Sequence, residues 1–291
     1  MAILVGPDTR LIVQGMTGRA GTFYSDLAIS YGTNVVGGVR PGKGGGRHLR
    51  LPLFDTVADA VRETDANATM VMVPAHKAAD ALMEAIEAEV PLLVCVTERI
   101  PVLDMVRVKH ALKGSKSRLV GANSQGVLAP EVCKIGVMST ADAKPGPIGI
   151  VSRSASLSSE VVAQTTNAGL GQSTTVGIGG DPIHGTGFVD CLELFMADPE
   201  TEAVVLIGEI GGAEEEQVAA YLAESGAKKP VVALVVGRHA MPQRCMGHAG
   251  TLSVFGTGTA EGKIAALKSA GALIAENVEE VSVLLKQALG R

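Results

Sequence analysis

The sequence predicts an α/β protein built from two doubly wound domains. Apolar runs of strand length alternate with stretches of helical period along the 291 residues. This alternation pauses between Pro130 and Pro147 and restarts at Ile148, and the 36 glycines lie mostly where a strand would meet a helix. Such alternation is typical of a parallel sheet covered by helices on both faces. Two domains of about 140 residues each are the economical interpretation.

The first half of the chain predicts five strands and two clear helices. Each expected strand is a short run rich in Val, Ile, Leu or Met, and each expected helix carries apolar residues at helical spacing. The expected strands are 11–14, 34–39, 69–73, 92–96 and 118–121, and the expected helices are 21–31 and 76–88.

The second half repeats the pattern with strands at 148–152, 173–178, 203–208 and 231–236. The segment before it, Ala141–Pro147, contains two prolines and a glycine and resembles a linker. The predicted boundaries are therefore a first domain at 1–128, a linker at 129–147 and a second domain at 148–291.

Composition excludes several classes of function. The net charge is −5 and no basic block is present, which argues against nucleic acid as a ligand. No apolar run reaches the roughly 20 residues that span a bilayer, so no membrane segment is expected. The N-terminus lacks a basic flank and a cleavage pattern, which favours a cytoplasmic protein. The four cysteines show no CxxC spacing, so neither a metal site nor a disulfide framework is expected.

A glycine-rich turn follows the first expected strand. Gln14–Gly21 opens the first helix, which is the context of a phosphate-binding turn, although a plain tight turn has the same composition. A NAD domain usually places an acidic residue after the second strand, whereas this chain has Arg40 and Lys43 there. These cations favour coenzyme A, which carries an additional phosphate, unless they form an ordinary solvated loop. Val73–Ala75 and Val96–Glu98 end the next strands, where a doubly wound sheet lines its ligand crevice.

The second half contains a segment suited to phosphate. Ser152–Ser156 runs from a strand end into a helix start, where backbone N–H groups bind anions. Ser154 and Ser156 can cap that helix with their hydroxyls facing an anion, or they are plain N-caps.

Two glycine-bracketed segments each carry one titratable side chain. Glu209 lies in Gly208–Gly212 after a strongly apolar strand, and His248 lies in Met246–Gly250. Neutral imidazole is abundant at pH 7 and is a competent nucleophile. A carboxylate on its other nitrogen can hold one tautomer and stabilise the developing cation. The pair predicts a histidine that is transiently phosphorylated.

Together these segments resemble the α subunit of succinyl-CoA synthetase, an ADP- or GDP-forming acid–CoA ligase. The resemblance covers nearly the whole chain and includes Gln14–Gly18, Val36–Gly45, Gly179–Pro182, Gly208–Gly212 and Met246–Gly250.

The resemblance implies a CoA-binding Rossmann domain followed by a flavodoxin-like, doubly wound ligase domain. It implies that His248 is the phosphorylated residue, that Glu209 is its partner, and that Ser154, Ala155 and Ser156 bind phosphate. A separate β subunit with an ATP-grasp site would hold ATP or GTP with Mg²⁺, in a heterodimer or a heterotetramer. The residues expected to contact CoA are Thr17, Gly18, Arg19, Ala20, Lys43, Pro74, Val96, Thr97 and Glu98.

Departures from the family pattern lie where the acid substrate is expected. Asn123–Gly126 replaces the family's Asn-Cys-Pro-Gly, and Ser159 replaces a tyrosine. Ser124, Gln125, Ser156 and Ser159 therefore add hydrogen-bond donors, which suit an anion with more acceptor oxygens than a carboxylate. We expect a short acid with a sulfonate end, such as sulfoacetate, ahead of malate and then succinate.

Two other classes remain as alternatives. A CoA-binding regulatory module without catalysis would have no use for both His248 and Glu209. A NAD oxidoreductase is disfavoured because the acidic residue after the second strand is missing and no hydride-transfer constellation is present.

Overall fold

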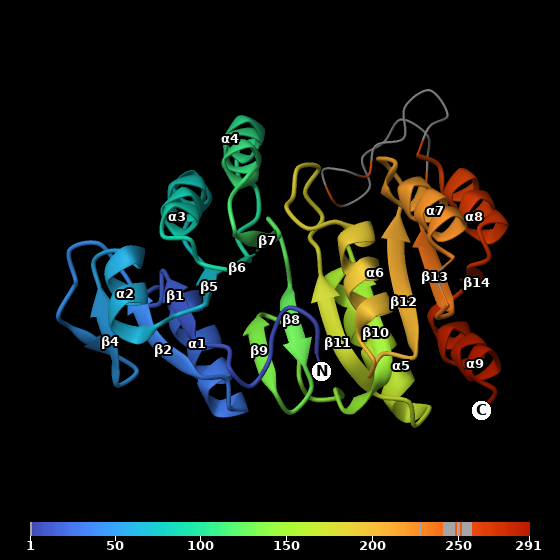
Figure 1. The fold of residues 1–291 in the computed structure, drawn as a ribbon, viewed down its shortest axis with the longest axis horizontal. Coiled ribbons are helices and arrows are strands. Elements are labelled where there is room, and N and C mark those ends of the chain that lie inside the picture. Colours follow the sequence, from blue (N-terminus) through green and yellow to red (C-terminus); the bar gives the residue numbers. More distant parts are fainter. Residues whose placement is uncertain (1, 227, 241–247, 249–250, 252–257) are drawn as a thin grey trace. The chain divides into compact units, whose positions relative to one another are not determined.

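The computed structural model describes residues 2–226, 228–240, 248, 251 and 258–291. It divides into two compact units (Figure 1). The N-terminal unit comprises Leu4–Met138 and Ile183–Thr186, and the C-terminal unit comprises Met1–Ile3, Ser139–Pro182 and Gly187–Arg291. The domain limits predicted at residues 128 and 148 stay a prediction.

The N-terminal unit contains a sheet in the order β3-β4-β2-β1-β5-β6-β7, in which only the β3–β4 pair is antiparallel. From β4 onward this is the strand order of dinucleotide-binding folds, and it reverses between β1 and β5. The elements are β1 (Leu11–Gln14), α1 (Arg19–Tyr31), β2 (Val35–Val39), β3 (Arg47–His48), β4 (Leu51–Phe54), α2 (Val57–Thr64), β5 (Ala68–Val71), α3 (Ala75–Glu87), β6 (Leu92–Cys95), α4 (Val102–Leu112), β7 (Arg118–Val120) and an antiparallel hairpin of β8 (Gly126–Ala129) and β9 (Cys133–Gly136).

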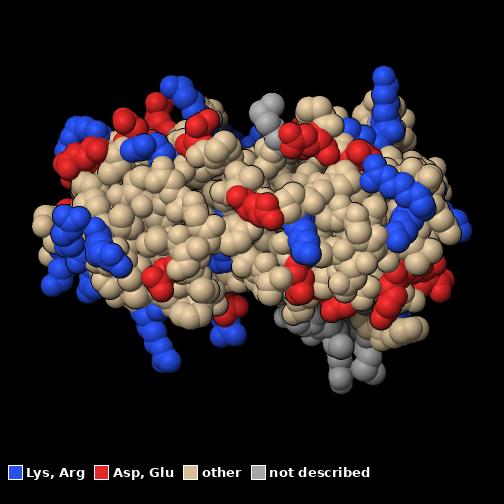
Figure 2. All heavy atoms as spheres, turned by 90° about the horizontal axis from the view of Figure 1, so that it is seen from below, with Lys and Arg blue, Asp and Glu red and all other residues tan. Residues whose placement is uncertain are grey.

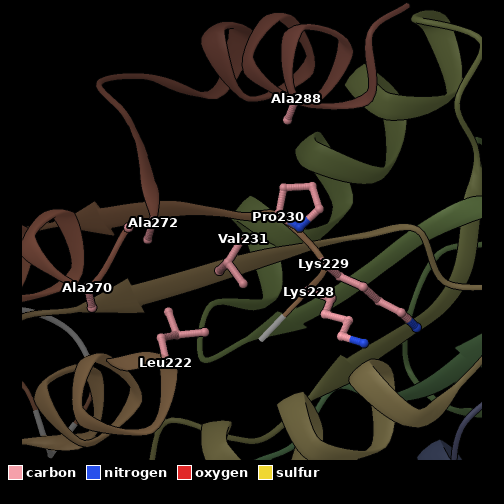
Figure 3. A pocket seen from close by; sticks show the side chains of 9 residues that line it. Leu222, Lys228, Lys229, Pro230, Val231, Ala270, Ala272 and Ala288 are labelled. Atoms are coloured by element: carbon pink, nitrogen blue, oxygen red, sulfur yellow. The ribbon is translucent and has the colours of Figure 1, made fainter. Parts of the chain in front are cut away.

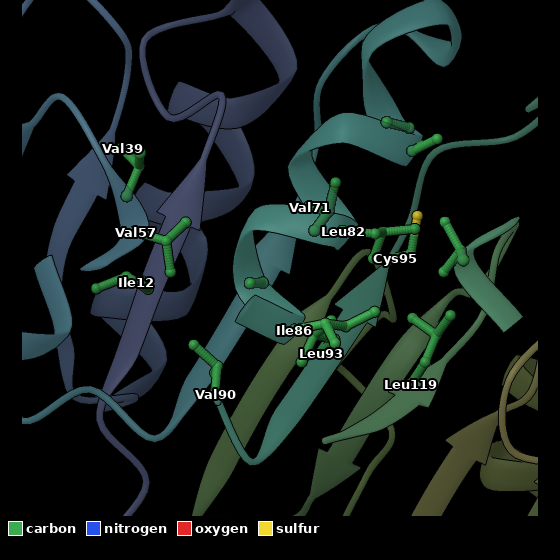
Figure 4. Close-up of a cluster of buried hydrophobic side chains, with 14 of the residues drawn as sticks. Ile12, Val39, Val57, Val71, Leu82, Ile86, Val90, Leu93, Cys95 and Leu119 are labelled. Atoms are coloured by element: carbon green, nitrogen blue, oxygen red, sulfur yellow. The ribbon is translucent and has the colours of Figure 1, made fainter. Parts of the chain in front are cut away.

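Aliphatic side chains fill the core of the N-terminal unit. Strands β1, β5 and β6 are buried at every position, as expected of parallel strands covered on both faces. Their side chains pack against α2, α3 and α4 (Figure 4). Residues from β1, β5, β6, α2 and α3 are among those drawn: Ile12, Val57, Val71, Leu82, Ile86 and Leu93.

The C-terminal unit contains five parallel strands in the order β14-β13-β12-β10-β11. This is the flavodoxin-like order, and it reverses between β10 and β12. The elements are β10 (Pro145–Ser152), α5 (Ala155–Asn167), β11 (Gln172–Gly177), α6 (Phe188–Ala197), β12 (Ala203–Glu209), α7 (Glu214–Ser225), β13 (Val231–Val236), α8 (Ala260–Ser269), β14 (Leu273–Ala275) and α9 (Val278–Leu289).

Successive side chains of each strand point to opposite faces of this sheet, and each face packs against different helices. Ile148, Ile150 and Val205 share one core cluster with residues of α5 and α9. Gly149, which lies between two of them, points the other way, since a Cβ added there would meet the Phe195 ring of α6 at 2.6 Å. The sheet is therefore covered on both faces.

The predicted fold class is confirmed in both units, and the strands predicted at 11–14 and 231–236 have the observed bounds. The prediction missed α2, α4, α6, α7, α8, α9 and the strands β3, β4, β8, β9 and β14. Strand β9 lies inside the predicted linker. The charged Lys134 interrupts its apolar run, yet the Lys134 side chain is buried and donates to the Gly136 carbonyl. Strand β10 also begins at Pro145 rather than at residue 148.

Charges of both signs are interspersed over the face drawn in Figure 2. Within the described residues, no helix is long and apolar enough to cross a membrane.

Candidate active site

The carboxylate of Glu209 lies at the carboxyl end of β12 and contacts the imidazole of His248. Nδ1 of His248 is 2.9 Å from Oε2 and 3.1 Å from Oε1. Glu209 is only 6% exposed, whereas His248 keeps about a third of its side chain accessible. The two residues paired in the sequence analysis are therefore brought together at the point where the strand order reverses.

This contact fixes the tautomer of His248. A carboxylate only accepts hydrogen bonds, so Nδ1 carries the hydrogen and donates it, leaving a lone pair on Nε2. The hydrogen bond to Glu209 raises the pKa of His248, while burial acts in the opposite direction. Chemically, such an arrangement leaves Nε2 able to act as a nucleophile, with a carboxylate placed to stabilise positive charge on the ring.

Arg153 is a site residue that sequence reasoning did not select. Its Nε lies 3.3 Å from Oε1 of Glu209, and both side chains are almost fully buried. Its guanidinium also donates to the Asp181 carbonyl at 3.4 Å. Arg153 opposes the rise in the pKa of His248 and Asp181 adds to it. A charged residue directly after an apolar strand, inside the candidate phosphate segment, was the signal that could have identified it.

The candidate phosphate segment begins α5. Ser154 is the N-cap, and its Oγ accepts from the Leu157 N–H at 3.3 Å. Ala155 and Ser156 form the exposed first turn. Because the first N–H groups of a helix lack intrahelical acceptors, this end can bind an anion.

Gly180 allows the imidazole to approach the loop after β11. A Cβ added at Gly180 would lie 2.4–2.6 Å from atoms of the His248 ring. No real Cβ tolerates that distance, so a larger residue would displace the ring.

In the N-terminal unit, the predicted phosphate turn is a tight turn that leads into α1. A Cβ at Gly21 would lie 2.1 Å from the Gly15 carbonyl oxygen, so the turn requires glycine there. Gly18 is the N-cap and has no side chain to satisfy the helix, while Thr17 accepts a hydrogen bond from Arg40. This uncapped start, which includes Arg19 and Ala20, fits a phosphate group.

The remaining residues expected to contact CoA also follow carboxyl ends of parallel strands. Lys43 lies in an exposed loop after β2, and its N–H donates to Asp55 Oδ1 at 2.9 Å. Pro74 follows β5 as the N-cap of α3. Val96, Thr97 and Glu98 follow β6, with the Thr97 hydroxyl donating to the Val73 carbonyl at 2.7 Å. All of them lie beyond the carboxyl ends of the strands, which is where doubly wound sheets bind their ligands.

The four residues expected near the acid divide between the two units. Ser124 and Gln125 lie in the N-terminal unit and are 3% and 6% exposed. Ser124 Oγ accepts from the Gly126 N–H at 2.8 Å. Ser156 and Ser159 lie on the exposed start of α5 in the C-terminal unit. Their role in acid binding stays a prediction.

Several residues of the sequence motifs, namely Cys245–Gly247 and Ala249–Gly250, lie outside the described residues. Within the described part, no group of three or more His, Cys, Asp or Glu side chains could hold a metal ion.

A separate pocket lies at the amino end of β13, the opposite edge of the sheet from Glu209 (Figure 3). It contains no residue selected from the sequence. Its lining includes Leu222, Lys228, Lys229, Pro230, Val231 and Ala272.

Comparison with known families matches both units. Residues 7–99 match the CoA binding domain family and residues 151–273 match the CoA-ligase family. The chain is 50% identical to the succinate–CoA ligase [ADP-forming] subunit α of Aquifex aeolicus, over 97% of this chain and 92% of that protein. It is 48% identical to subunit α 2 of the same ligase of Archaeoglobus fulgidus, over 99% of this chain and all of that protein.

Solved structures share the fold at lower identity. An ATP citrate lyase from Methanothrix soehngenii, in complex with citrate and coenzyme A, superposes with a TM-score of 0.88 at 22% identity. The match covers 99% of this chain and 50% of the lyase chain, so this chain spans about half the length of that protein. By its full-length similarity to the curated relatives, the chain belongs to the family of ADP-forming succinate–CoA ligase α subunits, a class of CoA ligases.

Proposed function

We propose that the chain is the catalytic α subunit of a nucleoside-diphosphate-forming acid–CoA ligase and that His248 carries the phosphoryl group. The observation that carries the proposal is the 2.9 Å contact between His248 Nδ1 and Glu209 Oε2. It leaves Nε2 with a lone pair and keeps a buried carboxylate behind the ring. A binding module without catalysis has no need of that geometry.

The phosphoryl group is transferred in two steps. Nε2 attacks the γ-phosphorus of ATP, so that an N–P bond forms, the bond to the β-γ bridging oxygen breaks, and ADP leaves. Glu209 stabilises the positive charge that develops on the ring. A carboxylate oxygen of the acid then attacks the same phosphorus, the N–P bond breaks, and His248 returns to its neutral form. The thiol of CoA displaces phosphate from the acyl phosphate and yields the thioester.

The N-terminal unit is proposed to hold CoA at the uncapped start of α1. The residues expected to contact CoA follow the carboxyl ends of the parallel strands of this unit, and they are Thr17–Ala20, Lys43, Pro74 and Val96–Glu98. The match of residues 7–99 to the CoA binding domain family supports this assignment over NAD.

The nucleotide is proposed to bind a partner chain. The relatives' printed designation as α subunits supports a β subunit, which we expect to carry an ATP-grasp site for ATP or GTP with Mg²⁺. A heterodimer or a heterotetramer is expected, and the cytoplasmic location stays a prediction.

The acid is proposed to be small and anionic at both ends. The amide of Gln125 and the hydroxyls of Ser124, Ser156 and Ser159 favour a sulfonate such as sulfoacetate. Malate is the second candidate and succinate the third on these residues, although the names of the relatives favour succinate and hence an ordinary succinate–CoA ligase.

Phosphorylation tests the central step. The chain is incubated with its β subunit and [γ-³²P]ATP, beside the His248→Asn variant. We expect acid-labile, base-stable label on the wild type and none on the variant. Label that persists in the variant would show that another residue carries the phosphoryl group. An unlabelled wild type would support the regulatory module without catalysis.

Thioester formation tests the acid. ADP release with CoA is compared across sulfoacetate, 3-sulfopropionate, malate, succinate, glutarate and citrate. A lost hydrogen-bond match costs on the order of 10²-fold in discrimination, so the preferred acid should stand out. A preference for succinate of roughly tenfold or more would reject the sulfonate proposal.

A further inference from the structure

A fully buried ion pair lies directly behind Glu209. Lys263 of α8 and Glu215 of α7 form a salt bridge, and the side chains of both are 0% exposed. The hydrogen bonds of these two side chains go to each other and to the backbone of Glu209 and Gly211 rather than to the imidazole. The pair therefore cannot act on the reacting nitrogen directly.

Both members of the pair bind the backbone around Glu209. Nζ of Lys263 donates to the Glu209 carbonyl at 2.9 Å and to the Gly211 carbonyl at 2.5 Å. Its third N–H is used by the carboxylate of Glu215. The other oxygen of that carboxylate, Oε1, accepts from the Glu209 N–H at 3.0 Å. One ion pair thus holds the N–H and the C=O of Glu209.

The neighbouring glycine provides space for this arrangement. A Cβ at Gly208 would lie 2.5 Å from Oε1 and 2.8 Å from Cγ of Glu215. Because successive residues of a strand point to opposite faces, the ion pair occupies the face opposite to the Glu209 side chain. The backbone is held from one side while the carboxylate meets His248 on the other.

Stability alone does not explain such a pair. Desolvating two charges offsets most of their attraction, and apolar replacements of similar volume are often neutral or stabilising. Here the ammonium directs two of its hydrogen bonds at the turn that ends β12. That turn is also tied to the start of α8, because the Gly211 N–H donates to the Gly258 carbonyl at 2.8 Å.

We infer that the Lys263–Glu215 pair is a positioning device that fixes the carboxylate of Glu209 against Nδ1 of His248. This inference rests on the proposed role of His248 as the phosphorylated residue. The two residues are positioning residues because they act only through the backbone of Glu209.

The test displaces the pair without removing a charge. Gly208→Ala places a methyl group against the carboxylate of Glu215. Gly149→Ala is the matched control, since it overpacks a neighbouring strand of the same sheet at 2.6 Å from the Phe195 ring. The charged groups that act on His248 are Glu209 of β12, Arg153 after β10 and Asp181 after β11, and neither substitution alters them.

Two measurements are made on the full chain labelled with ¹⁵N-histidine. The first is the NMR titration of the His248 ring, assigned with His248→Asn, and the second is the initial rate of ³²P uptake with the β subunit. In Gly208→Ala we expect the pKa of His248 to fall toward its ordinary value and uptake to slow by roughly 10- to 100-fold, because misplacement of a catalytic group by about 1 Å has effects of that size. Gly149→Ala should retain both wild-type values.

The double variant Glu215→Leu/Lys263→Met guards against misfolding of Gly208→Ala. It removes both charges and should show the same two changes, with a lower thermal unfolding midpoint because the Glu209 N–H and the Glu209 and Gly211 carbonyls lose their partners. Wild-type titration and uptake in either folded variant would overturn the inference. The wild type offers a third test. The Glu209 amide should exchange slowly because its N–H donates to Glu215, so rapid hydrogen exchange there would overturn the inference.

Failure of the proposed function is distinguishable from failure of this inference. If the wild type takes up no label, the proposed function fails. The NMR titration needs no ATP and still decides whether the pair positions Glu209.

Discussion

The two units share a doubly wound fold, but their candidate sites consist of different chemical groups. The N-terminal unit presents glycine backbone, an uncapped helix start and exposed basic side chains at the end of its strands. The C-terminal unit presents buried titratable side chains, among them Glu209 and Arg153, at the corresponding edge. Backbone N–H groups suit the binding of a phosphate that does not react, whereas a reaction needs side chains whose proton affinity the fold can adjust.

The largest expected effect comes from neutralising the carboxylate of the C-terminal unit. Glu209→Gln should slow phosphorylation of His248 by roughly 10²- to 10⁴-fold, since it removes the charge behind the ring. The affinity for CoA, measured by calorimetry, should stay at the wild-type value because the proposed CoA site lies in the N-terminal unit. If Glu209→Gln reduced CoA affinity as much as it reduced phosphorylation, CoA binding and phosphorylation would not belong to separate units.

Each unit also buries a lysine, and the comparison extends to these. Lys263 is paired with Glu215, whereas Lys134 donates to the Gly136 carbonyl and lies 5.7 Å from the centre of the Tyr24 ring. Burial lowers the pKa of Lys134 to about 8. Folding therefore disfavours its charged form, and the resulting cost is fully present below pH 8 and disappears as the pH rises from about 8 to 10.5.

Lys134→Met should accordingly stabilise the protein at pH 7 by about 2 kcal/mol, after allowance for solvent screening. The difference from the wild type, measured by urea unfolding, should shrink at pH 9.5. Lys116→Met removes an exposed lysine that pairs with Glu89 and serves as the control, with an expected change below about 1 kcal/mol. A stabilisation by Lys134→Met that does not depend on pH would contradict this account.

A smaller effect is expected from altering the turn of the N-terminal unit. Gly21→Ala forces a methyl group against the Gly15 carbonyl, and overpacking of about 1–3 kcal/mol should raise the Kd for CoA about tenfold. Gly6→Ala, which meets open space in the same unit, should leave the Kd unchanged. Phosphorylation of His248 should continue in both variants, and its loss in Gly21→Ala would show that the two sites are not separable.

The smallest expected effect is a displaced pH profile. Because the hydrogen bond to Glu209 raises the pKa of His248, the neutral nucleophile becomes abundant only above pH 6.5. The rate of phosphorylation should rise with pH through an inflection above 6.5, and Glu209→Gln should move that inflection downward. An inflection at or below 6.5 in the wild type would show that Glu209 does not act on the ring in solution.

Local sequence signals sufficed where one segment determines the outcome. Buried parallel strands such as β13 are continuous apolar runs, and the glycines around Glu209 and His248 predicted the pair that the structure brings into contact. Strand β9 was missed because the burial of Lys134 depends on Tyr24 and Thr33, which are distant in sequence. Glu215 and Lys263 were missed for the same reason, since their pairing exists only in the folded chain. Arg153 was overlooked although its place in the candidate phosphate segment was a signal in the sequence.

The central claim is that the phosphoryl group on His248 is a true intermediate, and a single-turnover chase tests it most directly. The ³²P-labelled complex is freed of nucleotide and mixed with CoA and the preferred acid. The account predicts that label leaves His248 at least as fast as kcat and that one thioester forms for each phosphate released. Release slower than kcat, or release without thioester, would contradict it.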